Sequence, residues 1–334
     1  MPNDVPSSSK QTAPNIPKGA LFVGWLGDKP VFLTPRDRST QLLVIGAAGT
    51  GKTTLLEYLI RQDMDARRGL CVIDPMGALY LRLMRYYSYL RAIGVKVPEL
   101  IPFNPSDGQW CLPYNPFARR GGDLAVQVDR RVQATLRAWG QQNSNDTPRL
   151  EKWLKCLYTV LIECNLTIIE AAYLLDVHAD DVRVALMRAV SDPFIRSKFE
   201  QLAFFKTTDF LNQIESVENR LMRFLSSSTM RRIMGVGTNA IDFATIMDKG
   251  KIQLVNLQPS EHLSSEQARL IGTLLVTEFF ETALTRETGA KPLYLYIDEA
   301  AKFVTPELGD IVEQCRQKGL HMTLAFQHLS QFKD

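Results

Sequence analysis

A glycine-rich loop between two different kinds of segment constrains the fold of this chain more than any other feature. Residues 46–53 read GAAGTGKT, which fits the pattern G-x-x-x-x-G-K-[ST] at every fixed position. The apolar run at 41–45 predicts a buried strand before the loop, and residues 53–62 predict a helix after it. Glycines allow positive φ and let several backbone N–H groups surround one phosphate, while the helix N-terminus adds its positive end. The arrangement predicts a phosphate-binding loop in an α/β fold.

The last residues of this loop have defined roles in such sites. Lys52 is expected to reach the β- and γ-phosphates of ATP, and Thr53 is expected to be a ligand of Mg²⁺. The alternative is a glycine turn with an exposed lysine, which the flanking strand and helix disfavour. The predicted nucleotide-binding residues are Gly46, Gly49, Thr50, Gly51, Lys52, Thr53 and Thr54. ATP and Mg²⁺ are therefore the expected cofactors.

Further short apolar runs alternate with helical segments along the rest of the chain. They lie at 69–73, 100–103, 251–257, 293–297 and 320–326. Strands that alternate with helices in this way form mostly parallel sheets covered by helices on both faces. Gly19 to Pro35 differ, because two short apolar segments separated by Gly27 and Asp28 predict a small hairpin.

Residues 119–235 lack the strand pattern and are predicted to form an all-helical insertion domain. Apolar side chains recur there at helical spacing, Thr167 and Glu170 fit a capping box, and Pro148 fits a first helical position. The predicted divisions are a disordered leader at 1–18, the first part of the P-loop domain at 19–118, the insertion at 119–235 and the second part of the P-loop domain at 236–334.

Two adjacent acids close the predicted strand at 293–297. Asp298 is expected to hold Mg²⁺ through a water molecule, and Glu299 to be the base that orients the attacking water. The alternative is that both acids cap a helix that begins near Ala300, where the helix dipole favours negative charge. The phosphate-binding loop upstream favours the first interpretation.

Three more residues are singled out by their positions. Gln327 follows the last strand, and ligands of open parallel sheets bind at the carboxyl ends of strands, so Gln327 is expected on the γ-phosphate side. Arg316, near the end of the helix before that strand, is either an arginine finger or a surface arginine. Asp74 either contacts the nucleotide site or shapes the turn before Pro75.

Composition limits the kinds of binding site and the cellular location that this chain is expected to have. The 39 basic and 36 acidic residues leave a net charge of +3, so any site for a polyanion must be local. The five cysteines form no C-x-x-C pair and the four histidines are scattered, which disfavours a zinc site or a disulfide framework and favours a reducing compartment. No apolar run reaches 18 residues, so no membrane span is expected, and the leader lacks the apolar core of a signal peptide.

Taken together, these segments resemble the HerA and FtsK branch of P-loop ATPases, and most closely the type IV coupling proteins, also called the TraG and TraD family. The similarity extends from about Gly19 to the end of the chain. It rests on LVIGAAGTGKTTLL, VIDPMG, PYNPF, LVNLQPS, YLYIDEAAKFVTPEL and QCRQKGLHMTLAFQHLSQF. Met76 is a departure, because relatives often have His at that position.

The resemblance implies a RecA/ASCE-like P-loop NTPase fold with an all-helical insertion domain. It makes Lys52 and Thr53 the phosphate and Mg²⁺ residues and makes Asp298 and Glu299 the Walker B pair. It makes Arg316 a finger that acts on the neighbouring subunit of a ring, and Gln327 the sensor.

The activity that the resemblance implies is an ATP-hydrolysing DNA translocase, a hexameric ring that serves conjugative DNA transfer or type IV secretion. Its expected partners are DNA, bound without sequence preference, and relaxosome or secretion-channel proteins. The expected location is cytoplasmic, at most peripheral at the inner face of the cell membrane. Two alternatives remain open at this point: a HerA-like translocase for DNA-end processing, and a secretion-system assembly ATPase that acts on protein.

Binding to the DNA backbone requires Lys and Arg side chains, and the insertion domain is rich in arginine. The candidates are Arg119, Arg120, Arg130, Arg131, Arg220, Arg223, Arg231 and Arg232. The alternative for each of them is an ordinary solvated helix face.

Overall fold

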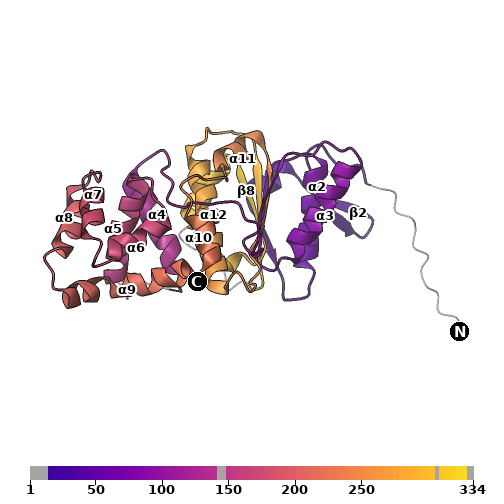
Figure 1. Ribbon diagram of the computed structural model, residues 1–334. Helices are drawn as coiled ribbons and strands as arrows, with labels where there is room; N and C mark the ends of the chain where they lie inside the picture. The colour runs from indigo at the N-terminus through magenta and orange to yellow at the C-terminus, as the bar shows by residue number, and fades with distance from the viewer. Residues whose placement is uncertain (1–13, 141–147, 305–307, 329–334) are drawn as a thin grey trace.

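The computed structural model describes residues 14–140, 148–304 and 308–328 (Figure 1). Most of the expected leader, residues 1–13, lies outside the described part. β1 (Leu21–Leu26) and β2 (Lys29–Leu33) pair antiparallel as a separate two-stranded sheet. The predicted hairpin is therefore confirmed.

The main sheet has six strands, all paired in parallel, in the order β3-β8-β7-β4-β6-β5. The strands are β3 (Leu42–Ile45), β4 (Leu70–Asp74), β5 (Leu100–Phe103), β6 (Ile252–Asn256), β7 (Leu293–Ile297) and β8 (Leu320–Phe326). The α/β fold with a parallel sheet is thus confirmed. Because every strand runs the same way, all six carboxyl ends meet at one edge.

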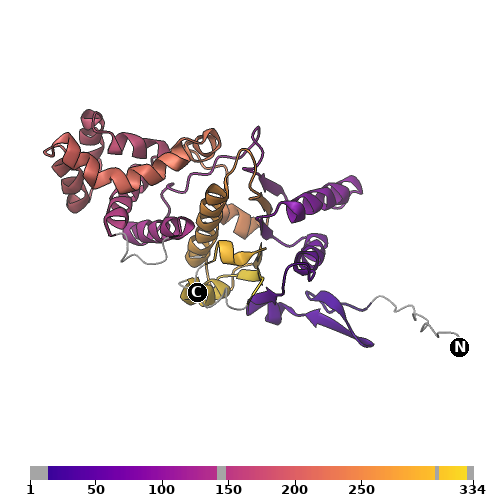
Figure 2. The ribbon, with the colours of Figure 1, turned by 90° about the horizontal axis from the view of Figure 1, so that it is seen from below.

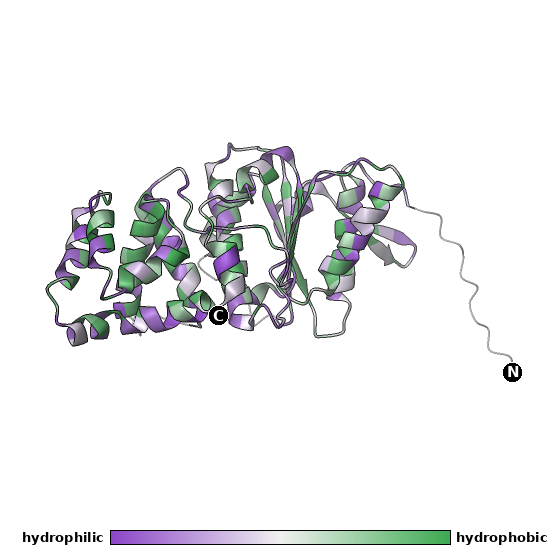
Figure 3. Ribbon diagram, viewed as in Figure 1, coloured by the Kyte–Doolittle hydropathy of each residue, from purple (hydrophilic) through white to green (hydrophobic). Residues whose placement is uncertain are grey.

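Helices cover both faces of this sheet, as Figure 1 shows. α2 (Lys52–Asp65) and α3 (Ala78–Ala92) cover one face, and α12 (Ser265–Thr285) and α11 (Phe243–Lys249) cover the other. Alternation along β4 explains why the sheet separates two cores: Leu70 and Val72 pack with α2 and α3, whereas Cys71 and Ile73 join the opposite core. In Figure 3 the strands of this sheet are largely in the apolar colour, whereas the helices that cover it mix apolar and polar residues.

A group of helices stands beyond α12, away from the sheet (Figure 2). It comprises α4 (Leu124–Ala138), α5 (Pro148–Glu163), α6 (Ile168–Leu175), α7 (Asp180–Met187), α8 (Pro193–Leu202), α9 (Thr207–Leu225) and α10 (Ser228–Met234). Pro148 begins α5, and Thr167 with Glu170 forms the predicted capping box at the start of α6. The core of this group is continuous with the core on the α12 face of the sheet.

α12 lies between the sheet and α4 and is buried on most of its circumference. A helix that is packed on all sides needs no narrow apolar stripe, which explains its mixed sequence. Within the described residues, the remaining helical elements are α1 (Pro35–Ser39), the 3₁₀ turn η2 (Ala300–Lys302) and α13 (Leu308–Gln317). Within the described ranges, no helix combines the length and the apolar character that crossing a membrane requires.

Candidate active site

The glycine-rich loop joins β3 to α2 at the carboxyl edge of the sheet. Gly49 (φ 77°) and Gly51 (φ 91°) both have left-handed backbone conformations. A Cβ at Gly46 would lie 2.6 Å from Thr50 Oγ1, so any larger residue at this position would displace the Thr50 side chain. Gly46 N donates to Phe326 O over 3.2 Å, which ties the start of the loop to the end of β8. The sequence therefore adopts the tight, N–H-rich turn that a phosphate group requires.

Lys52, the first residue of α2, folds its side chain back over this loop. Its Nζ donates to Gly46 O at 2.6 Å and to Ala47 O at 2.9 Å. These two carbonyls hold the ammonium group above the turn, where it is able to exchange them for phosphate oxygens. The lysine is thus placed by the loop itself and is only half-buried.

A hydrogen bond from Thr53 to Asp298 brings the two sequence motifs together. Thr53 Oγ1 donates to Asp298 Oδ2 at 2.8 Å, although the two residues are 245 positions apart. Asp298 is only 3% exposed, because the fully buried strand β7 delivers it to the carboxyl edge of the sheet. Its backbone N–H donates to Ile73 O of the neighbouring strand. A hydroxyl and a carboxylate oxygen thus converge beside the phosphate-binding loop.

Glu299, the next residue, has a left-handed backbone conformation with φ 47° and ψ 50°. This conformation costs a non-glycine residue about 1–2 kcal/mol, and such strain is concentrated at functional sites. The alternative that the two acids cap a helix is wrong for two reasons: only the short turn η2 follows, and Glu299 makes no side-chain cap hydrogen bond to it. Asp298 is bound to Thr53 instead.

Both carboxylate oxygens of Glu299 have partners. Gln327 Nε2, just after β8, donates to Glu299 Oε1 at 3.2 Å. Lys302 Nζ lies 2.5 Å from Glu299 Oε2. The structure therefore brings Gln327 to the site as expected, and it adds Lys302, which the sequence reasoning missed. The only signal for Lys302 was its i,i+3 spacing from an acid.

Asp74 at the end of β4 shapes the turn that follows it. Its buried carboxylate accepts hydrogen bonds from the backbone N–H groups of Met76 and Tyr80, both at 2.8 Å. Burial raises the pKa of Asp74, and the charge of Asp298 raises it further. The turn-shaping alternative is the one that these bonds support, and the Met76 side chain at this turn is exposed.

Arg316 lies at the opposite edge of the sheet. It is exposed in the last turn of α13, which precedes β8, whereas Gln327 follows β8. A strand of seven residues spans about 20 Å. Burial, followed by the charges of Arg38 and Arg316, lowers the pKa of His321 to about 4, which places Arg316 near the start of the strand. Arg316 is therefore far from the phosphate-binding loop of its own chain.

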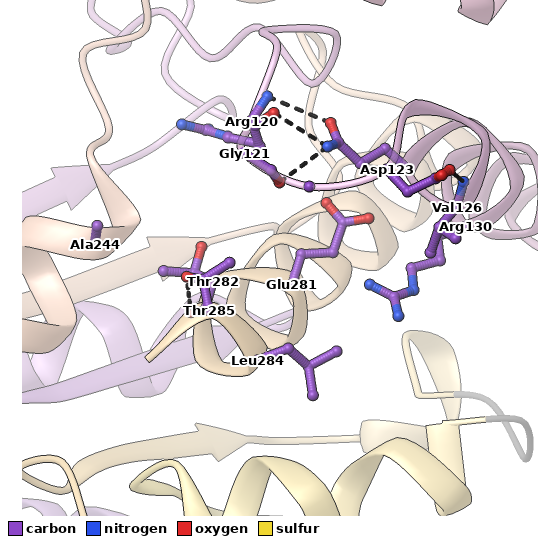
Figure 4. A pocket seen from close by; sticks show the side chains of 12 residues that line it. Arg120, Gly121, Asp123, Val126, Arg130, Ala244, Glu281, Thr282, Leu284 and Thr285 are labelled. Carbon is purple, nitrogen blue, oxygen red and sulfur yellow. Dashed lines mark hydrogen bonds between the residues drawn. The ribbon is translucent and has the colours of Figure 1, made fainter. Parts of the chain in front are cut away.

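The structure corrects one of the DNA-contact candidates and constrains another. Arg131 is 1% exposed and donates to Glu278 Oε1 and Glu281 Oε2 of α12, both at 2.7 Å. Arg120 also pairs with Glu278, at 3.2 Å. Figure 4 shows Glu281 projecting from α12 beside a pocket of about 380 Å³ whose lining includes Arg120 and Arg130. Arg131 is thus not a DNA contact but joins the helical group to the P-loop fold, because buried charges require such pairing.

The other arginines differ in exposure. Arg220 is half-buried and donates to Ser216 of its own helix. Arg231 and Arg232 are exposed and donate to the carbonyls of Leu225 and Gly108 respectively. The exposed candidates are Arg119, Arg223, Arg231 and Arg232.

Comparison with known proteins supports the similarity that the sequence indicated. Residues 292–334 match the family described as "TraM recognition site of TraD and TraG". This segment contains both acids of the site, Arg316 and Gln327. Among curated proteins, no sequence matches this chain.

Solved structures share the fold across almost the whole chain. The bacterial conjugative coupling protein TrwBdeltaN70, in its unbound monoclinic form, matches with a TM-score of 0.61 and 17% identity over 95% of this chain and 67% of its own. The plasmid coupling protein TrwB in complex with ADP and Mg²⁺ matches at 0.59 and 18% identity, over 95% and 70%.

VirB4 of Thermoanaerobacter pseudethanolicus also matches, with a TM-score of 0.59 and 13% identity over 96% of this chain and 80% of its own. These identities establish the fold alone. The resemblance to type IV coupling proteins within the P-loop ATPases is confirmed by the fold together with the family match at residues 292–334.

Proposed function

We propose that this protein is an ATP-hydrolysing DNA translocase motor of the coupling-protein type, which serves conjugative DNA transfer or type IV secretion. The observation that carries the proposal is the hydrogen bond of 2.8 Å between Thr53 and Asp298. It joins the two halves of a P-loop nucleotide site across 245 residues, in a fold shared with the TrwB complex that contains ADP and Mg²⁺.

The residues at this edge suit ATP and Mg²⁺. Gly49 and Gly51 supply the positive φ values of a phosphate cradle, and Lys52 stands over it. Thr53 and Asp298 offer a hydroxyl and a carboxylate oxygen, which are the hard ligands that Mg²⁺ prefers. When bound, Mg²⁺ would neutralise the charge that develops on the phosphates. Thr53 and Asp298 are the residues that would hold it.

Glu299 is the base in this mechanism, and Gln327 orients it. Its carboxylate would accept a proton from the attacking water, while the Gln327 amide fixes one of its oxygens. Arg316 is far from this site within one chain, so the finger role proposed for it requires a neighbouring subunit. This geometry supports a ring in which each site is completed by the Arg316 of the next copy.

The proposed substrate is DNA, contacted through its backbone. The exposed arginines Arg119, Arg223, Arg231 and Arg232 are the candidates, and the family description of residues 292–334 supports a relaxosome protein as a further partner. Backbone contacts release counterions, so affinity is expected to be insensitive to sequence and to fall with a log–log salt slope of about −0.9 per phosphate contact on duplex DNA.

The experiment is a fluorescence-anisotropy titration with two unrelated duplexes and one single strand, each at low and high salt. Similar affinity for all sequences, and a steep loss with salt, supports the proposal. An absence of binding at low salt would favour the protein-directed assembly ATPase instead. A HerA-like role in DNA-end processing predicts the same binding but a nuclease partner.

A further inference from the structure

The Lys302 side chain contacts Glu299 and also lines a neighbouring pocket. Its Nζ lies 2.5 Å from Glu299 Oε2, on the side of the carboxylate that Gln327 does not occupy. A carboxylate with both oxygens engaged by donors is poorly placed to accept a proton from water. In this arrangement the Lys302 ammonium holds the proposed base in an inactive pairing.

The same side chain lines a pocket of about 240 Å³. The walls come from the turns after β4 and β6, from the first turns of α12 and from η2. Its lining includes Pro75, Leu257, Pro259, Arg269, Lys302 and Phe303. The turns after β4 and β6 lie at the carboxyl edge of the sheet, and η2 follows β7 at the same edge. The pocket therefore adjoins the nucleotide site.

The charge of this pocket is positive. Arg269, exposed on α12, and Lys302 both line it, and among the described residues no acidic side chain does. The nearest acid along α12 is Glu266, which lies 3.9 Å from Arg223 of α9. Glu299 is in contact with Lys302, and the carboxylate of Asp74, which precedes Pro75, accepts from the backbone of Met76 and Tyr80. Two cations in one small concave site fit an oxyanion such as a phosphate group.

The backbone around Lys302 is held firmly, whereas its side chain is not. Phe303 is 2% exposed and packs so tightly on α12 that a Cβ at Gly272 would approach its ring to 2.3 Å. The Lys302 side chain is 44% exposed. The ammonium group is therefore able to turn from Glu299 into the pocket by side-chain rotation alone, without a shift of η2.

We propose that this pocket binds a phosphate oxyanion of the DNA backbone, and that binding there draws Lys302 away from Glu299 and releases the base for hydrolysis. The inference rests on the proposed function and specifies how DNA controls the ATPase site. Lys302 is a positioning residue that acts through Glu299, and Arg269 is the second ligand of the phosphate.

The test measures ADP release by this chain with and without a single-stranded oligonucleotide. Lys302→Met is expected to raise the basal kcat about two- to fivefold, the range that a partly exposed ion pair supports, with the KM for ATP unchanged. The DNA-dependent stimulation is expected to be lost at the same time. Lys302→Arg is expected to restore the low basal rate, because it keeps the charge that pairs with Glu299.

Arg269→Ala separates the two roles of the site. Because Arg269 lines the pocket beside Lys302 but is not a partner of Glu299, its loss is expected to act on the response to DNA more than on the basal rate. The oligonucleotide concentration for half-maximal stimulation is expected to rise. Lys29→Met, an exposed lysine on the separate β1–β2 hairpin, is the matched control and should change neither quantity.

A parallel series with inorganic phosphate in place of the oligonucleotide identifies the source of the oxyanion. Stimulation by DNA alone assigns the pocket to the DNA backbone, and stimulation by phosphate alone would assign it to the free anion and overturn the DNA assignment. If wild type responds to DNA and Lys302→Met responds equally, or if Lys302→Met is inactive, the inference fails and the proposed function survives. If wild type ignores DNA, the proposed function itself fails.

Discussion

Two carboxylates of this protein, Asp63 and Glu299, have opposite surroundings. Asp63 is fully buried and accepts four hydrogen bonds, two from Arg38 and one each from Arg68 and the Tyr296 hydroxyl, over distances of 2.6 to 2.9 Å. Glu299 is 21% exposed and has two partners, one of them the exposed ammonium group of Lys302.

The difference between their partners explains why one carboxylate stabilises the fold and the other is available for catalysis. Every lone pair of Asp63 is used within the protein, so the cluster fixes α1 and α2 against β7 and leaves nothing for a ligand. Glu299 stands at the strand end on a strained backbone with partners that are exchangeable for water or phosphate. The fully paired Asp63 cluster stabilises the fold, whereas the exposed Glu299 carboxylate is able to exchange its partners for a substrate.

The largest expected effect comes from Glu299→Gln. The amide cannot accept a proton, so kcat is expected to fall by about 10²–10⁴-fold while ATP binding is retained. Steady-state kinetics and nucleotide titration measure the two quantities. Lys52→Ala is the contrasting variant, because loss of its ammonium should weaken nucleotide binding itself. A Glu299→Gln protein with the unmodified rate would remove Glu299 from the mechanism.

Asp63→Asn is the reciprocal change and should act on stability. It leaves Arg38 and Arg68 without their buried counter-charge, so the free energy of unfolding is expected to fall by about 3–5 kcal/mol. Chemical denaturation measures this loss. Asp65→Asn is the matched control, since Asp65 is exposed and accepts one hydrogen bond from Tyr86. Equal stability of the two variants would contradict the structural role of the Asp63 cluster.

Arg316→Ala tests whether the site at Glu299 needs a second chain, because Arg316 is far from Glu299 within one chain. Each single variant, Arg316→Ala or Glu299→Gln, is expected to be nearly inactive, whereas a mixture should regain part of the activity at interfaces that pair two intact halves. Wild-type activity should also rise more than linearly with protein concentration. An active Arg316→Ala protein without complementation would assign this arginine to the surface and weaken the case for a ring.

The smallest expected effect is a pH dependence of stability from His321. Burial is the main cause that lowers its pKa to about 4, against 6.5 for an ordinary histidine. Between these values the unfolded chain binds a proton that the folded chain does not, so stability is expected to fall as pH decreases from 6.5 toward 4 and to level off below that. His321→Gln should reduce this slope in thermal melts at pH 7 and pH 5. An unchanged slope would mean that other groups produce it.

Local sequence patterns predicted much of this structure. The strands at 100–103, 293–297 and 320–326 have the predicted bounds, and the glycine loop has the expected conformation. These features succeed because burial on both faces and positive φ are properties of short segments, which a short pattern specifies.

The failures concern partners that lie far away in the sequence. Arg131 has the pattern of a solvated helix face, yet its carboxylate partners are about 150 residues later on α12. The contact of Arg38 with Tyr296 spans 258 residues. The helix that the capping alternative placed near Ala300 is a short 3₁₀ turn, because the left-handed Glu299 and the packing of Phe303 on Gly272 dictate that segment. Tertiary packing determines the partners of these residues, and a local sequence pattern does not predict such packing.

The most direct test of the central claim is the steady-state ATPase rate of the unmodified protein, measured with and without single- and double-stranded DNA at two salt concentrations. The account predicts that DNA stimulates hydrolysis at low salt, that the sequence of the DNA makes no difference, and that stimulation declines steeply as salt rises. A hydrolysis rate that is the same with and without either form of DNA, at both salt concentrations, would contradict it.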